Sequence, residues 1–177
     1  MSLRIGIILG STRDGRVSES VGNWVLENTD NTDNVLYEIV DLRDYKLPFL
    51  GTSDDNATII KWNQKLDELD GYIFIVAEYN HSITAALKNA LDLASDAWNN
   101  KSAGIVSYGS AGGARAAEHL RGILSELQIA SVRTHILLSL FDDFENYSFK
   151  PRDIHEDNLN SLFIQVKNWA KALRAIR

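Results

Sequence analysis

The stretch GYIFIV at residues 71–76 is a continuous apolar run, and it decides the fold. The run LRIGIIL at residues 3–9 has the same character and ends at Gly10. Short runs rich in β-branched and aromatic residues predict strands that are buried on both faces, as in a parallel sheet. We therefore interpret both runs as strands of one parallel sheet.

Strand and helix patterns alternate along the rest of the chain. Such alternation predicts an α/β fold in which right-handed crossovers place helices on both faces of a parallel sheet. No linker or internal repeat divides the sequence, so residues 1–177 are expected to form a single domain. Ser18 is expected to cap the first helix. The other strands are predicted at residues 35–42, 103–107 and 132–138, and the helices at about residues 18–27, 55–70, 82–94, 116–127 and 159–173.

The composition narrows the possible functions. With 18 basic and 24 acidic side chains, the net charge of −6 argues against broad binding to nucleic acid or to anionic membranes. The sequence has no cysteine, which excludes disulfides, thiolate catalysis, thiolate zinc sites and iron–sulfur clusters. No apolar stretch is long enough for a membrane span or a signal peptide. We therefore expect a cytoplasmic protein with the composition of an ordinary folded enzyme.

Three loops are candidates for a functional site. In open α/β sheets, ligands bind beyond the carboxyl ends of the strands. This rule selects residues 10–18, 77–82 and 108–113, which follow three of the predicted strands.

The loop GSTRDGRVS at residues 10–18 suits an anion. It leads into a helix N-terminus, where free backbone N–H groups and the helix dipole favour negative charge. It lacks the Gly-Lys-Ser/Thr ending of a P-loop and the G-x-G-x-x-G of a dinucleotide cradle, so a terminal monophosphate is the favoured ligand. The alternative is an ordinary polar loop with solvated arginines. The hydroxyl and guanidinium donors of this loop are Ser11, Thr12, Arg13, Arg16 and Ser18.

The loop AEYNHS at residues 77–82 offers hydrogen-bonding groups and a flat apolar face, on which a planar heteroaromatic ring could rest. The alternative is a turn in which Asn80 or Ser82 only caps the next helix. The loop YGSAGG at residues 108–113 allows close approach of backbone to a ligand, because glycine has no side chain. Its alternative is a flexible turn before a helix.

Several motifs together resemble the NADPH-dependent FMN reductase family, which includes quinone, chromate and azo-dye reductases. The motifs are GSTR at residues 10–13, EYN at 78–80, LKNALD at 87–92 and GGAR at 112–115, in the same order and at similar spacing. The resemblance implies a flavodoxin-like three-layer sandwich with a five-stranded parallel sheet in the order 2-1-3-4-5. It also implies bound FMN, reduced by NADPH or NADH, and a quinone, azo, metal-oxyanion or free-flavin acceptor.

The resemblance also implies roles for individual residues. Ser11, Arg13 and Ser18, with Arg16 less surely, would hold the FMN phosphate. The family has proline where this chain has Ala77, so backbone contacts to the flavin are expected to be looser. Because the flavin itself carries the chemistry, no catalytic acid, base, nucleophile or metal is predicted. The isoalloxazine would be bordered by Ala77, Glu78, Tyr79 and Asn80 on one side and by Ser107, Gly109, Ser110 and Gly112 on the other.

Members of this family are commonly dimers or tetramers, so a homodimer or homotetramer is expected. Trp62 and the aromatic loop around Phe144 and Tyr147 are the predicted interface residues. Two other functions stay open: a flavodoxin-like electron carrier, and a non-catalytic protein that resembles the family. A signalling receiver domain is excluded, because the Gly10-Ser11 corner offers no carboxylates for magnesium.

Overall fold

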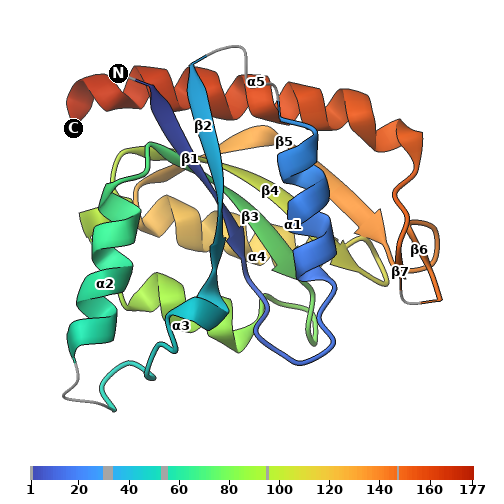
Figure 1. Cartoon of the computed structure of the whole chain (residues 1–177), viewed down its shortest axis with the longest axis horizontal. Coiled ribbons are helices and arrows are strands. Elements are labelled where there is room, and N and C mark those ends of the chain that lie inside the picture. The colour runs from blue at the N-terminus through green and yellow to red at the C-terminus, as the bar shows by residue number, and fades with distance from the viewer. Residues whose placement is uncertain (1, 30–33, 53–55, 95, 147) are drawn as a thin grey trace.

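The structure, a computed structural model, describes residues 2–29, 34–52, 56–94, 96–146 and 148–177. Five parallel strands form one sheet in the order β2-β1-β3-β4-β5 (Figure 1). The predicted α/β class and strand order are therefore confirmed. The strands are β1 (Leu3–Leu9), β2 (Val35–Asp41), β3 (Gly71–Ala77), β4 (Lys101–Gly109) and β5 (Ile129–Ser139), followed by a small hairpin of β6 (Phe144–Glu145) and β7 (Ser148–Phe149).

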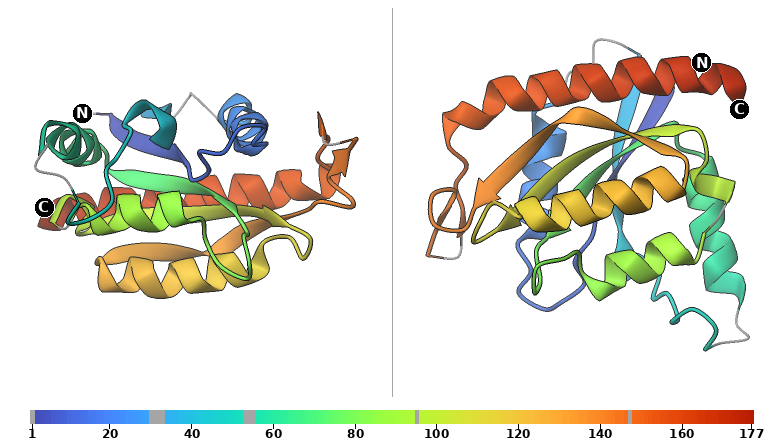
Figure 2. Two further views of the ribbon diagram at one scale, coloured as in Figure 1. Left: turned by 90° about the horizontal axis from the view of Figure 1, so that it is seen from below. Right: turned by 180° about the vertical axis from the view of Figure 1, so that it is seen from behind.

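Helices cover both faces of the sheet and make a three-layer arrangement (Figure 2). One face is packed by α1 (Ser18–Glu27) and by α5 (Glu156–Leu173), which runs along the whole length of the molecule (Figure 1). The other face is packed by α2 (Asn56–Asp67), α3 (Ala85–Asp92) and α4 (Ala114–Glu126). None of the helices described is long and apolar enough to cross a membrane.

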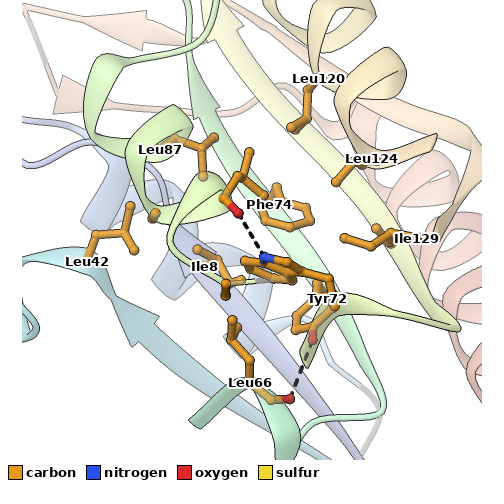
Figure 3. Packing of buried hydrophobic residues seen from close by; sticks show 14 of the residues in the cluster. Ile8, Leu42, Leu66, Tyr72, Phe74, Leu87, Leu120, Leu124 and Ile129 are labelled. Carbon is orange, nitrogen blue, oxygen red and sulfur yellow. Dashed lines mark hydrogen bonds between the residues drawn. The ribbon is translucent and has the colours of Figure 1, made fainter. Parts of the chain in front are cut away.

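The core beneath α2, α3 and α4 is rich in aromatic residues (Figure 3). Trp62, Trp98 and Tyr72 are fully buried, with ring centroids 5.8 Å apart for the two tryptophans and 5.0 Å for Tyr72 and Trp98. The Trp62 indole N–H donates to the carbonyl oxygen of Ala90 at 2.9 Å, so this tryptophan joins α2 to α3. The prediction that Trp62 contacts another subunit is wrong, because its side chain has no exposed surface.

The helix starts differ from prediction in two places. Val17 takes the N-cap position of α1 and makes no side-chain cap, while Ser18 lies inside the helix. Helix α3 begins at Ala85, and the Thr84 hydroxyl caps it by accepting from the Leu87 N–H at 3.0 Å. The predicted Ser18 cap is therefore wrong, and neither Asn80 nor Ser82 caps α3, contrary to the alternative for the loop at residues 77–82.

The hairpin after β5 contains the predicted aromatic loop. Phe144 is half-buried, with its ring centroid 5.2 Å from that of Phe149 and 6.2 Å from that of Tyr108. Tyr147, the other predicted interface residue of this loop, lies outside the described residues. The hairpin thus packs against the end of β4, close to the predicted site.

Candidate functional site

A cavity of about 760 Å³ opens at the carboxyl ends of the strands. This volume lies within the range of about 300–1,000 Å³ that is usual for small-molecule sites. Three of its four walls include residues of the loops that the sequence predicted to bind a ligand, at residues 10–18, 77–82 and 108–113. The lining residues are Arg13, Gly15 and Val17 after β1, Glu78 and Tyr79 after β3, Tyr108 and Gly109 of β4, and Leu140, Phe141, Phe144 and Asn146 after β5.

The N-terminus of α1 has the features of an anion site. No side chain caps this helix, so its first N–H groups have no side-chain acceptor. The Ser18 hydroxyl is buried and has no well-aligned hydrogen-bond partner among the described residues, although the Tyr108 phenol lies near both this hydroxyl and that of Ser11. Ser11 is also buried, and its hydroxyl lies 3.0 Å from that of Tyr79. A buried hydroxyl without a partner is costly, so this corner fits a phosphate that would accept these donors.

Arg16 is committed to the protein and shapes the loop. Its guanidinium donates to the Ser11 carbonyl at 2.8 Å and forms a two-pronged ion pair with Asp41. The hydrogen bonds that Arg16 donates to Asp41 raise the pKa of Arg16, in spite of burial. Arg43 supports the same loop by donating to the carbonyl of Thr12 at 3.0 Å. Of the two predicted arginines, Arg16 therefore fixes the loop, and Arg13 lines the cavity.

Arg13 faces the cavity and is exposed. Its guanidinium carbon lies 5.7 Å from the centroid of the Tyr79 ring, which is cation–π distance. The two predicted site residues are thus brought together from different loops. This pairing places a positive charge at the rim of the α1 corner.

Glu78 is an ionised anchor beside the cavity. Its carboxylate, of which only 4% is exposed, accepts from the backbone N–H of Arg115 at 3.2 Å and forms an ion pair with the Arg115 side chain. Burial alone would raise the pKa of Glu78, but the hydrogen bond and charge of Arg115 outweigh it and lower the pKa. The carboxylate therefore holds α4 against the end of β3, and it is not a proton donor at neutral pH.

The loop after β4 is held by its own side chain. Ser107 is buried, and its hydroxyl donates to the carbonyl of Gly112 at 2.8 Å. A Cβ on Gly109 would lie 3.0 Å from the Cβ of Glu78, so glycine keeps the two loops in close contact. Ser107 and Gly112 therefore support this wall from behind, while Gly109 reaches the cavity.

The remaining predicted site residues do not line the cavity. Ala77 is fully buried as the last residue of β3 and is paired with Tyr108 in the sheet. Asn80 and Ser110 are exposed and do not line the cavity, and Thr12 lines a second cavity described below. Their direct contact with a flavin stays a prediction.

The α4 N-terminus gives a direct test of the backbone geometry. Gly113 caps α4 at φ 74°, and an added Cβ would lie 2.8 Å from both the Cβ of Ser107 and the backbone nitrogen of Tyr108. We expect Gly113→Ala to lower the free energy of unfolding by about 2–4 kcal/mol in urea titrations. Gly122→Ala, in the open middle of the same helix, should raise it by about 1 kcal/mol. Equal stability of Gly113→Ala and the unmodified protein would contradict this geometry.

The sequence did not predict the wall of the cavity that follows β5. Leu140, Phe141, Phe144 and Asn146 follow β5, and the rule about strand ends would have selected them had it been applied to this strand. Tyr108 was also missed as a lining residue. Burial raises its pKa to about 12, so its phenol stays neutral and can donate a hydrogen bond.

The fold and this site define a class of protein. A parallel sheet in the order 2-1-3-4-5, with an open helix N-terminus and a cavity at its carboxyl end, is the arrangement of flavodoxin-like nucleotide-binding proteins. Residues 3–143 match the family described as NADPH-dependent FMN reductase. The chain belongs to this family of NADPH-dependent FMN reductases, and it is therefore an oxidoreductase.

Individual relatives agree with this assignment. The chain is 34% identical over 146 residues to an NAD(P)H-dependent FMN reductase of Schizosaccharomyces pombe, which covers 77% of this chain and 73% of the relative. It is 36% identical over 131 residues to an NAD(P)H:quinone oxidoreductase of Solanum tuberosum, covering 68% and 66%. FerB, a flavoenzyme NAD(P)H:(acceptor) oxidoreductase from Paracoccus denitrificans, superposes with a TM-score of 0.77 over 96% of this chain and 98% of that chain. At 17% identity, this last likeness shows the fold alone.

Proposed function

We propose that this protein binds FMN in the 760 Å³ cavity and passes electrons from a nicotinamide nucleotide to a small planar acceptor, most simply a quinone. The observation that carries the proposal is the unpartnered, buried Ser18 hydroxyl at the uncapped N-terminus of α1. Together with Arg13 it forms a monophosphate site that opens into the cavity. Names of relatives add support for the acceptor, since one of them is a quinone oxidoreductase.

The residues suggest how FMN would be held. Ser11, Ser18 and Arg13 would bind the phosphate, and the ring would lie against Tyr79 and the backbone of Gly109. When bound, the flavin supplies hydride acceptance and electron delivery. The protein supplies position and a water-poor wall.

The acceptor side of the cavity is apolar. Leu140, Phe141 and Phe144 line it. An aromatic and aliphatic wall favours flat, weakly polar molecules through stacking and burial of apolar surface. These residues favour a quinone over a metal oxyanion, which would need cationic donors at this wall.

The deciding experiment is visible absorption of the purified protein with added FMN, followed by anaerobic NADPH and then NADH. We expect a bound yellow flavin that bleaches on adding the nucleotide and regains its colour with a quinone. Bound flavin that stays oxidised would identify an electron carrier instead. Failure to bind FMN would reject the proposal and favour a non-catalytic protein.

We further propose that the protein works as a homodimer or homotetramer with the flavin near a subunit boundary. Phe141 is 78% exposed at the edge of the cavity, and the neighbouring Leu140 is 43% exposed. Exposed apolar groups of this kind often mark an interface. Light scattering should give the mass of two or four chains, and Phe141→Ser should shift it towards one chain. A monomer at all concentrations would contradict this proposal.

A further inference from the structure

A second cavity of about 470 Å³ lies on the other side of the loop at residues 10–18. The two cavities meet at this loop, because Thr12 lines the second and Arg13 lines the first. The other walls of the second cavity come from η2 (Leu42–Asp44), from the segment that follows η2 and from the first turns of α3. The second cavity shares no lining residue with the first, so binding of FMN in the first cavity gives it no role.

The walls of the second cavity are fixed by hydrogen bonds. The Asn89 side chain donates to the carbonyl of Pro48 at 2.8 Å and accepts from the N–H of Leu50 at 3.1 Å. These two bonds hold the residue between them, Phe49, over the cavity. On the opposite side, Arg43 is tied to the Thr12 carbonyl at 3.0 Å. The cavity is therefore formed before any ligand arrives.

The lining combines apolar faces with one uncompensated positive charge. Phe49 is 67% exposed, and Leu47 lies beside it in the lining. Arg43 pairs with Asp14, so its charge is offset. Lys46 is exposed, and within the described residues it has no hydrogen bond or ion pair. In a protein of net charge −6, a lysine so placed favours an anion next to a flat apolar group.

We propose that this cavity binds the adenosine half of the nicotinamide nucleotide, with the adenine against Phe49 and Leu47 and an adenosine phosphate on Lys46. The inference rests on the proposed function and adds the donor's binding site to it. An adenosine phosphate has the required chemistry, a flat heteroaromatic ring beside a concentrated negative charge. Because the two cavities share one loop, a nucleotide anchored here would have its nicotinamide end beside the flavin cavity.

Direct binding tests the site without the reaction. Adenosine 2′,5′-bisphosphate would be titrated calorimetrically into the protein, with and without FMN. We expect Lys46→Gln to weaken binding by roughly tenfold or more, because a hydrogen bond to a charged group is lost. Lys46→Arg should keep most of the affinity, and Phe49→Ala should weaken it. Lys171→Gln, which removes a lysine from the last turn of α5, is the control for net charge.

Kinetics then separate this site from the flavin site. We expect Lys46→Gln to raise the KM for NADPH with kcat at saturation and the FMN affinity unchanged. An increase for NADPH alone would place the 2′-phosphate on Lys46, and an increase for NADH as well would place the pyrophosphate there. An unchanged bisphosphate affinity would overturn the proposal, as would a Lys46→Gln variant whose only effect is a changed oligomer mass. The titration without FMN remains readable even if flavin reduction fails, so the two proposals can fail separately.

Discussion

Replacing Asp143 by alanine is expected to lower the free energy of unfolding by about 3–5 kcal/mol, because it removes a buried carboxylate that accepts several hydrogen bonds, two of them from side chains. The Asp143 carboxylate has no exposed surface. It accepts from the N–H of Ser139 at 2.8 Å, from Arg152 Nε at 2.9 Å and from His155 Nε2 at 2.8 Å. Without it, the buried His155 and the Ser139 N–H lose their acceptor, whereas the Arg152 side chain, which is 49% exposed, can turn to water.

The same carboxylate shapes the cavity. It ties the end of β5, at Ser139, to the residues that lead into α5, and the lining residues Leu140 and Phe141 form the loop between Ser139 and Asp143. Loss of the cluster should therefore loosen the fourth wall of the site as well as the fold. FMN affinity would fall together with stability.

Thermal unfolding measures this prediction. The melting temperature of Asp143→Ala should fall by roughly 6–20 °C, given about 2–4 °C per kcal/mol for a chain of this size. Asp142→Ala, at the exposed neighbouring position, is the matched control and should change it little. A result within a few degrees of the unmodified protein would show that the cluster is not a main source of stability.

The pH dependence has a definite sign. Burial would raise the pKa of Asp143, but its hydrogen bonds, first of all to Arg152, lower it to about 2. A carboxyl whose pKa is lower in the folded state stabilises the fold at neutral pH, and this contribution is lost as the pH falls from about 4 through 2. The stability difference between Asp143→Asn and the unmodified protein should therefore shrink over that window.

Replacing Arg13 by alanine is expected to weaken FMN binding by roughly 10- to 150-fold, the range for a lost hydrogen bond to a charged group. Arg13 is the cation of the loop that faces the cavity, whereas Arg16 and Arg43 are bound to protein groups. Stability should change little, because Arg13 is exposed and its side chain contacts the ring of Tyr79 without an ion pair among the residues that the structure describes.

Quenching of flavin fluorescence gives the affinity for each variant. Arg133→Ala, on the exposed side of β5, removes the same charge away from the site and should leave FMN affinity unchanged. If Arg13→Ala binds FMN as tightly as the unmodified protein, Arg13 has no contact with the phosphate. If both variants lose affinity equally, the effect is one of overall charge.

Much of the fold could be predicted from local patterns. The runs at residues 3–9 and 71–76 are strands because a parallel sheet covered on both faces requires continuous apolar segments. The periodicity of apolar residues then predicted that strands and helices alternate. The positions of the loops predicted three of the four segments that line the cavity at the carboxyl end of the sheet. The strands β4 and β5 begin earlier than predicted, because Lys101 and Ser102 pair with Ile129 and Ala130, and such pairing cannot be read from either short segment alone.

By itself, the sequence determined the α/β class and the family, and it predicted the loop at residues 10–18 as an anion site and the glycines of the loop at residues 108–113 as a place of close backbone approach. These properties depend on residue type and on spacing along the chain, which are local. Only the tertiary structure decided how charges pair and which side chains lose their exposure. In the folded chain, Arg16 pairs with Asp41, whereas Arg13 lines the cavity. Trp62 lies in the core. Those outcomes depend on contacts between residues that are distant in sequence, and such contacts exist only once the sheet and its helices have packed.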